Sequence, residues 1–334
     1  METHLLSPDR DAFETVILAD STSSDSAFIL ANTLPASLTE IREQHIIPVY
    51  SKDNEPLISH GDFVDAAVDT VCRLFRHETV LEPAVRVSHP VKGRIPQARN
   101  KPAKELFDWE KTLYYERAAF VIEIPSIHET IDGNPLSLTV GGVKAYNMDS
   151  LHQKKGTDEH FKVFIGFQNK VCTNLCVWSD GYVADLRVKS IDQLIQGVEK
   201  LISDYQAQAQ LTMLAQLTDY YLSEKQFAQL IGRCKLYQYL PTAFKREIPL
   251  LLLGDQQLGV IARDYYQDQS FCRQQDGTIS LWRVYNLLTG AVKSSYIDTF
   301  LDRNVNAFDL TTGILRSLQG LQTSQGNGYG WFLH

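Results

Sequence analysis

The sequence has few of the features that mark secreted or membrane-spanning proteins. Its five cysteines among 334 residues are an odd number, which does not suit a disulfide framework. No apolar run approaches the roughly 20 residues that a membrane helix needs. The acidic N-terminus lacks the basic and apolar regions of a secretory signal. We therefore expect a cytoplasmic protein with reduced thiols and no membrane partner.

Motifs for several common chemistries are also missing. The sequence contains no G-x-x-x-x-G-K-[ST] phosphate loop, no G-x-G-x-x-G after a strand, no H-E-x-x-H and no G-x-S-x-G. None of the nine histidines lies in a nucleophile or metal-ligand pattern. The sequence therefore predicts no catalytic residue and no cofactor.

The charge of the chain is unevenly distributed. The formal net charge is −8, and residues 1–60 hold ten acidic residues against three basic ones, a net charge of −7. These residues are also rich in Ser, Thr and Asp, which is typical of disorder. We predict an acidic, partly disordered segment over residues 1–60, with short ordered pieces where it docks, and a single domain over residues 61–334. The acidic arm is a candidate surface for a protein partner.

The opposite charge is concentrated in residues 86–104 (RVSHPVKGRIPQARNKPAK), which carry six Lys or Arg and no Asp or Glu. Their prolines and glycine predict a loop. Such a loop suits phosphate contacts with single-stranded DNA or another polyanion, and the alternative is a solvated loop that neutralises acids elsewhere. Four aromatic residues follow closely: Phe107, Trp109, Tyr114 and Tyr115. The candidate nucleic-acid-binding residues are Arg86, Lys92, Arg94, Arg99, Lys101 and Lys104.

The pattern of apolar residues predicts an α+β fold with a central antiparallel sheet of about four strands. The expected strands are residues 120–127, 136–146, 161–172 and 176–188, preceded by a helix over 62–76, a short strand over 82–87 and a short helix over 105–116. The connections are too short for crossover helices, which favours antiparallel pairing. Gly141-Gly142 inside a strand indicates a bulge or a close backbone approach.

From residue 190 onward the sequence predicts a mostly helical half, after a β-rich centre over residues 80–188. Ser190-x-x-Gln193 and Ser223-x-x-Gln226 are capping-box patterns that open helices. Further helices are expected over residues 282–290 and 294–306.

Two patterns raise the question of a metal. Asp298 and Asp302 lie one helical turn apart and could hold Mg²⁺, or they could form a solvated face or pair with a basic residue such as Lys293 or Arg303. Cys172 and Cys176 are separated by three residues, which is not the zinc-knuckle interval, so we expect buried thiols there.

Several strings resemble one uncharacterised bacterial family, a domain of unknown function carried largely on mobile and conjugative elements. They include SHPVKGRIPQAR (88–99), LTVGGVKAYN (138–147), FIGFQNKVCTNLCVW (164–178) and LWRVYNLLTGAVKSSYIDTFLDRNVNA (281–307). The resemblance covers about residues 80–334. More distantly, residues 171–174 and 285–289 are similar to a broader phage- and plasmid-related uncharacterised family. No activity comes with either resemblance, which implies only a setting of horizontally moving DNA.

Three functional hypotheses follow. The first is a non-enzymatic, DNA-associated protein of a mobile element, with an architecture like that of single-strand annealing proteins. The second is an anti-restriction or inhibitor module whose acidic arm mimics DNA. The third is a Mg²⁺-dependent phosphodiesterase that uses Asp298 and Asp302.

Overall fold

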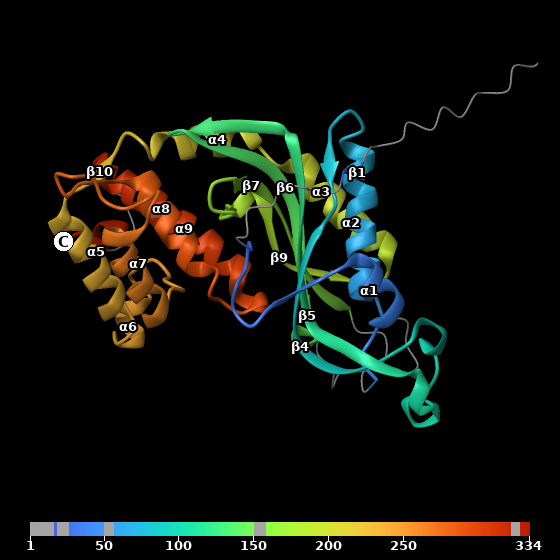
Figure 1. Ribbon diagram of the computed structural model, residues 1–334. Coiled ribbons are helices and arrows are strands. Elements are labelled where there is room, and N and C mark those ends of the chain that lie inside the picture. Colours follow the sequence, from blue (N-terminus) through green and yellow to red (C-terminus); the bar gives the residue numbers. More distant parts are fainter. Residues whose placement is uncertain (1–16, 19–26, 50–56, 150–157, 322–327) are drawn as a thin grey trace, which may run out of the picture.

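The computed structural model of the protein describes residues 17–18, 27–49, 57–149, 158–321 and 328–334 (Figure 1). Its strands are β1 (Ile17–Leu18), β2 (Leu34–Ala36), β3 (Val80–Leu81), β4 (Ala84–Arg94), β5 (Lys111–Ile131), β6 (Asn134–Ala145), β7 (Glu159–Asn169), β8 (Leu175–Cys176), β9 (Tyr182–Val188), β10 (Tyr221–Leu222) and β11 (Ile279–Ser280). Its α-helices are α1 (Leu38–Gln44), α2 (His60–Leu74), α3 (Ile191–Asp204), α4 (Ala207–Gln216), α5 (Glu224–Tyr237), α6 (Thr242–Lys245), α7 (Asp255–Gln267), α8 (Leu281–Val292) and α9 (Ile297–Leu318).

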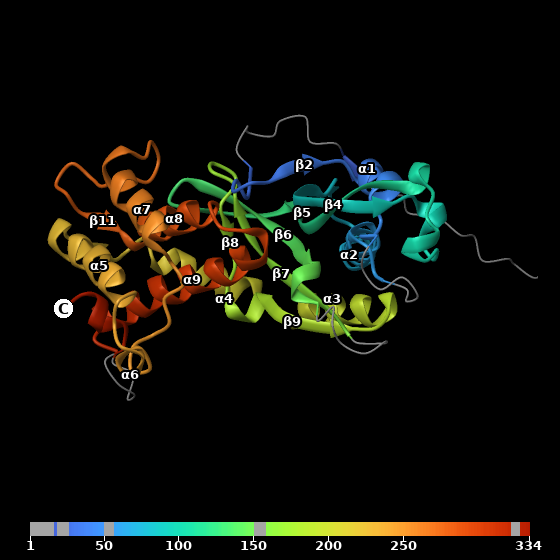
Figure 2. The ribbon, with the colours of Figure 1, turned by 90° about the horizontal axis from the view of Figure 1, so that it is seen from below.

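Seven of the described strands form one antiparallel sheet at the centre of the molecule. The order is β2-β4-β5-β6-β7, and β8 and β9 both pair with the outer edge of β7 (Figure 2). The α+β class is confirmed, but the expectation of about four strands was wrong. The segment expected as one strand over residues 176–188 is divided into β8 and β9. β2 lies in the segment expected to be partly disordered, and the second half of β4 lies in the tract expected to be a loop.

A tight turn joins the two longest strands of the sheet. Asp132 and Gly133 both have left-handed φ values, 49° and 72°, as the two-residue turn favoured in β-hairpins requires. The pairing of β5 with β6 then slips between Ile124 and His128. Pro125, which lacks an N–H group, lies inside this slip, so the irregularity is placed where the ladder cannot be completed.

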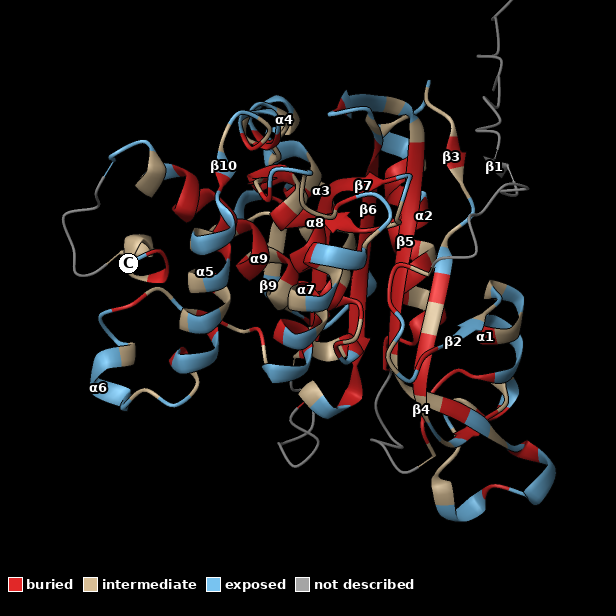
Figure 3. Ribbon diagram, turned by 60° about the vertical axis from the view of Figure 1, so that its left-hand side comes forward, coloured by how far each residue is buried: buried red, intermediate tan, exposed pale blue. Residues whose placement is uncertain are grey.

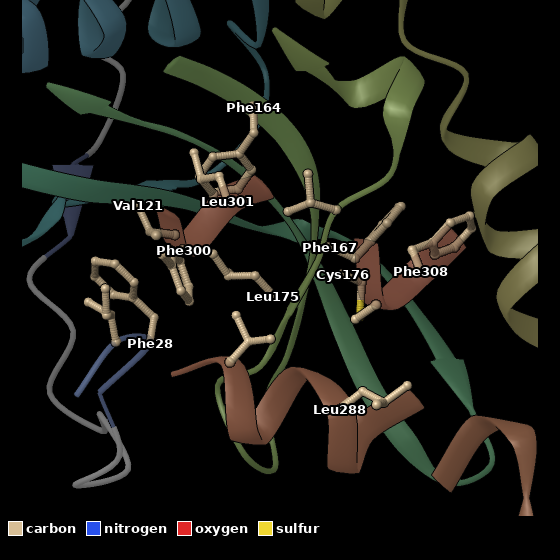
Figure 4. Packing of buried hydrophobic residues seen from close by; sticks show 14 of the residues in the cluster. Phe28, Val121, Phe164, Phe167, Leu175, Cys176, Leu288, Phe300, Leu301 and Phe308 are labelled. Carbon is tan, nitrogen blue, oxygen red and sulfur yellow. The ribbon is translucent and has the colours of Figure 1, made fainter. Parts of the chain in front are cut away.

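Helices cover both faces of the sheet (Figure 1). On one face α2 inserts Phe63 between Phe120 and Phe161, with ring centroids 4.9 and 4.8 Å away. On the other face α8 and α9 pack together with the segment that follows residue 27, and Phe28 lies against Phe300 with the ring centroids 6.2 Å apart (Figure 4). The hydrophobic core is therefore continuous through the sheet.

The two adjacent glycines of β6 allow this packing. A Cβ atom on Gly141 would lie 2.2 Å from the carbonyl oxygen of Phe120, and one on Gly142 would lie 2.4 Å from Cζ of Phe63. The register of β6 is unbroken at both positions. The close approach expected from the sequence is confirmed, and no bulge is needed.

The helical C-terminal half begins as the sequence predicts. The hydroxyl oxygen of Ser190 accepts a hydrogen bond from the backbone N–H of Gln193, and Ser223 forms a full capping box with Gln226. The helices expected over residues 282–290 and 294–306 correspond to α8 and the longer α9. Within the described residues, no helix combines the length and the apolar character needed to cross a bilayer.

The described part of the N-terminal segment belongs to the fold. Residues 27–49 supply β2 and α1, and Phe28 and Ile29 are buried in the main core. The structure thus shows docked pieces within the predicted acidic segment and folded structure before residue 61. Residues 1–16, 19–26 and 50–56, where most of the predicted disorder falls, lie outside the described residues.

Candidate nucleic-acid interface

The basic tract is a strand over its first half, which corrects the prediction of a loop. β4 runs through Pro90 to Arg94. Because β2 pairs only with residues 85–87, the later part of β4 has no β2 neighbour, and proline is tolerated on such an edge. The helix expected over residues 105–116 is also absent: three short 3₁₀ turns span residues 96–110, and β5 starts at Lys111.

This arrangement creates a projecting ribbon at one end of the sheet. We call residues 88–94 of β4 and 111–117 of β5 the ribbon, and residues 95–110, which connect them, the tip. The tip lies at the lower right of Figure 1, and much of it is exposed in Figure 3. Arg94 is fully buried beneath the tip, where its guanidinium donates to the carbonyl oxygens of Val49, at 2.7 Å, and Lys101.

Two other candidate arginines also make contacts within the folded chain. The Nη2 atom of Arg86 donates to the carbonyl oxygen of Thr33 at 2.9 Å, and burial lowers the pKa of Arg86. Arg99 forms an ion pair of 2.8 Å with Asp62, which attaches the tip to the start of α2. These arginines therefore hold neighbouring segments together.

The three lysines of the tract differ in exposure and in pairing. Lys101 is half-buried and donates to both carboxylate oxygens of Glu110, at 3.0 and 2.8 Å. Lys92 and Lys104 are exposed, and in the part of the chain that the structure describes neither has a carboxylate partner. Lys111, which lies outside the basic tract, adds an exposed lysine at the start of β5, in an ion pair with the exposed Asp108.

The tip also presents two aromatic rings to solvent. The rings of Phe107 and Trp109 are nearly parallel, with an angle of 11° between planes and 6.0 Å between centroids. Their exposed fractions are 60% and 69%, and the neighbouring Leu113 is 58% exposed. Tyr114, which follows in the sequence, is fully buried and its hydroxyl lies 2.5 Å from that of Tyr146.

Glu110 fixes the orientation of this aromatic pair. Its carboxylate accepts the backbone N–H of Phe107 at 2.8 Å as well as the two bonds from Lys101. These hydrogen bonds hold the pKa of Glu110 below its usual value, and the bond from Lys101 has the largest effect. The carboxylate is therefore ionised at neutral pH. Lys101 in turn lies 4.1 Å above the centroid of the Phe107 ring. The rings are therefore held by a local network although they are exposed.

The structure places Asp298 and Asp302 at the junction of α9 with the sheet. Lys162 donates to the carbonyl oxygen of Asp298 at 2.6 Å and to the carboxylate of Asp302, while the Tyr182 hydroxyl donates to Asp302 at 2.8 Å. Arg117 lies 3.3 Å from the Asp298 carboxylate. Among the described residues, no group of three His, Cys, Asp or Glu side chains could hold a metal ion. These contacts favour the docking of α9 as the role of both carboxylates, with Lys162 and Arg117 as partners in place of the expected Lys293 or Arg303.

Cys172 and Cys176 lie near α8. Cys176 is fully buried, as expected, whereas Cys172 is only half-buried; burial raises the pKa of the Cys172 thiol to about 11. The turn between β7 and β8 is bonded to α8, because Asn169 donates to the side chain of Asn286 at 3.0 Å and Asn174 donates to its carbonyl oxygen at 2.9 Å. Residues 171–174 and 285–289, noted together in the sequence, therefore meet in space.

Comparison with known proteins identifies a family without giving an activity. A family model described as "Domain of unknown function, B. Theta Gene description (DUF3871)" matches residues 12–333. The match begins well before residue 80, where the resemblance seen in the sequence starts. No curated protein and no solved structure matches the chain.

Proposed function

The chain belongs to the DUF3871 family, whose description states no activity, and we propose from the geometry of the tip that it binds single-stranded DNA without catalysing a reaction. Phe107 and Trp109 are the surface on which bases stack, and exposed lysines beside them contact phosphates. The observation that carries this proposal is the pair of parallel, exposed rings held in place by Glu110 and Lys101.

The physical argument rests on two properties of single strands. Every base has a flat face, so stacking on an aromatic ring contributes about 1–3 kcal/mol per base with little sequence preference. Each phosphate that a lysine neutralises releases a counterion, which makes binding salt-dependent. Residues 92–113 carry six Lys or Arg against three Asp or Glu, a local charge of +3 on a chain of charge −8.

The setting of horizontally moving DNA, which the sequence resemblance implies, is part of this proposal. The two other hypotheses lead to different results in the same assays. Mg²⁺-dependent cleavage of the oligonucleotide supports a phosphodiesterase. Affinity for a host nuclease without affinity for DNA supports an inhibitor module that acts through the acidic N-terminal arm.

The decisive experiment is fluorescence anisotropy with a labelled oligonucleotide of about 12 nucleotides, a length within the usual range for such sites. We expect binding at low salt, with a slope of log K against log salt of about −1.4 if Lys92 and Lys104 each contact a phosphate. If Lys101 and Lys111 also contact phosphates, the slope becomes steeper, about −2.8. Replacing Lys92 and Lys104 together with Ala should flatten the slope without changing the melting temperature.

The aromatic pair is tested separately. Trp109→Ala should weaken binding at least about fivefold, because one stacked base is lost. Trp109→Phe should keep most of the affinity while removing the quenching of tryptophan fluorescence by the oligonucleotide. Tyr239→Ala is the matched control, since Tyr239 is 73% exposed and lies beyond α5, in the helical half of the chain. Equal binding by the parent protein and Trp109→Ala would reject the proposal.

A further inference from the structure

Tyr296 offers a second exposed ring at the other end of the ribbon. It precedes α9 and is 51% exposed. The guanidinium of Arg117 lies 5.7 Å from the centroid of its ring, and the ring of His89 lies 6.0 Å away at an angle of 62°. Two side chains of the ribbon thus hold the Tyr296 ring, although Tyr296 belongs to the helical half.

One face of the ribbon connects Tyr296 with the tip. Alternate residues of a strand share a face, so Leu113 and Arg117 point to the same side of β5. Their partners in β4 are Lys92 and Ser88. Arg117 follows Leu113 by four positions in the strand, a distance of about 14 Å.

The middle of this face is open in part. Pro90 is exposed opposite Tyr115, which is half-buried beneath the ring of His45, 5.6 Å from it. α9 reaches the ribbon at Asp298, whose carboxylate contacts Arg117. Among the described residues no α-helix continues from there over Lys92 and Leu113, which are both exposed.

On the premise of the proposed function, we propose that a bound single strand leaves the tip, follows this face of the ribbon past Lys92 and stacks a base on Tyr296. Lys92, opposite Leu113, supplies positive charge where the path leaves the tip. Arg117 is paired with both Asp298 and Glu116, so within the described part of the chain the cation beside the Tyr296 ring, at the far end of the path, is already neutralised. A base, which is flat and uncharged, fits that end better than a phosphate does.

The length of the oligonucleotide separates this inference from the proposed function. We titrate the parent and three variants with labelled strands of two lengths, about 4 and about 12 nucleotides. Both lengths fall within the usual range for single-strand sites. We expect the shorter strand to occupy the tip alone and the longer strand to bind more tightly. Tyr296→Ala should lower the affinity for the longer strand about tenfold, or about 1.4 kcal/mol, and leave the affinity for the shorter strand unchanged.

Two controls protect the interpretation. Tyr296→Phe keeps the ring and should bind both strands as the parent does, as should Tyr239→Ala in the helical half. The side chain of Tyr296 makes no capping hydrogen bond to α9, so its truncation should leave the melting temperature close to that of the parent. If Tyr296→Ala shows the parent's full preference for the longer strand, the path along the ribbon is wrong while the tip proposal stands. If the parent binds neither strand, both proposals fail.

Discussion

Replacing His60 with glutamine is expected to reduce the loss of stability that the protein shows on acidification. His60 is the first residue of α2, and its ring stacks on Tyr114 with the centroids 5.0 Å apart. Its Nε2 atom lies 2.8 Å from the carbonyl oxygen of Tyr115, which can only accept, so Nε2 carries the hydrogen. Nδ1 is buried and has no hydrogen-bond partner among the described residues. Protonating Nδ1 would therefore bury a charged N–H group without an acceptor.

The size of the effect follows from the pKa. Burial, with a smaller contribution from the positive charge of Lys144, lowers the pKa of His60 from 6.5 to about 3. Above pH 6.5 both the folded and the unfolded chain leave the imidazole neutral. Below it the unfolded chain binds a proton that the folded chain does not accept until the pH approaches 3. The free energy of unfolding then falls by about 1.4 kcal/mol for each pH unit, and by about 5 kcal/mol over the whole window.

Urea unfolding at several values between about pH 7.5 and about pH 4.5 measures this slope. The amide of His60→Gln can still donate to Tyr115 but does not titrate, so its curve should be flatter than the parent's by about 1.4 kcal/mol per pH unit below pH 6.5. Phe63→Leu, in the same helix, is the control: it should lower the curve at every pH and leave its slope unchanged. A slope for His60→Gln equal to that of the parent would refute the reasoning.

Three further predictions concern packing and metals. In a denaturant titration, Gly142→Ala should lower the free energy of unfolding by about 1–3 kcal/mol, because the added Cβ displaces Phe63. Gly259→Ala is the control: Gly259 lies in open space within α7, so this substitution should raise the free energy of unfolding by up to about 1 kcal/mol. Asp302→Asn should destabilise the protein by about 2–3 kcal/mol, because Lys162 is buried and loses its carboxylate partner. If calorimetry finds Mg²⁺ bound by the parent and not by this variant, the metal hypothesis is supported instead. Elemental analysis should find no stoichiometric zinc, and chelator should leave the melting temperature unchanged, because Cys176 is fully buried and Cys172 is half-buried, with no cluster of metal ligands among the described residues. About one zinc per chain would contradict this.

The elements best predicted from the sequence are those whose signals are local. Ser190 and Ser223 open helices because a capping hydrogen bond involves residues three positions apart. Gly141 and Gly142 signalled a close approach because no side chain fits in the interior of a packed sheet there. β2 was not predicted, since its three residues become a strand only by pairing with residues about 50 positions later.

Only part of the site was predicted, because the sequence shows local composition but not long-range contacts. The basic composition located the ribbon, but Pro90 concealed a strand that its edge position permits. The sequence also could not separate Arg94, which is fully buried, from Lys92, which is exposed two residues away. Nor could it separate the buried Tyr114 from the exposed Trp109, because burial depends on which segments fold over each position. The nearest signal was the aromatic residues that follow the basic tract.

The contacts between α9 and the sheet have a consequence for the order in which the chain folds. The turn at Asp132 and Gly133 lets β5 and β6 pair as soon as they leave the ribosome, since loop closure there is very short. The bonds from Lys162 and Arg117 to Asp298 instead join residues 136 and 181 positions apart. One face of the sheet therefore stays without α9 from the time β7 has emerged until residues 297–318 have been made, and the growing chain exposes apolar surface during that interval.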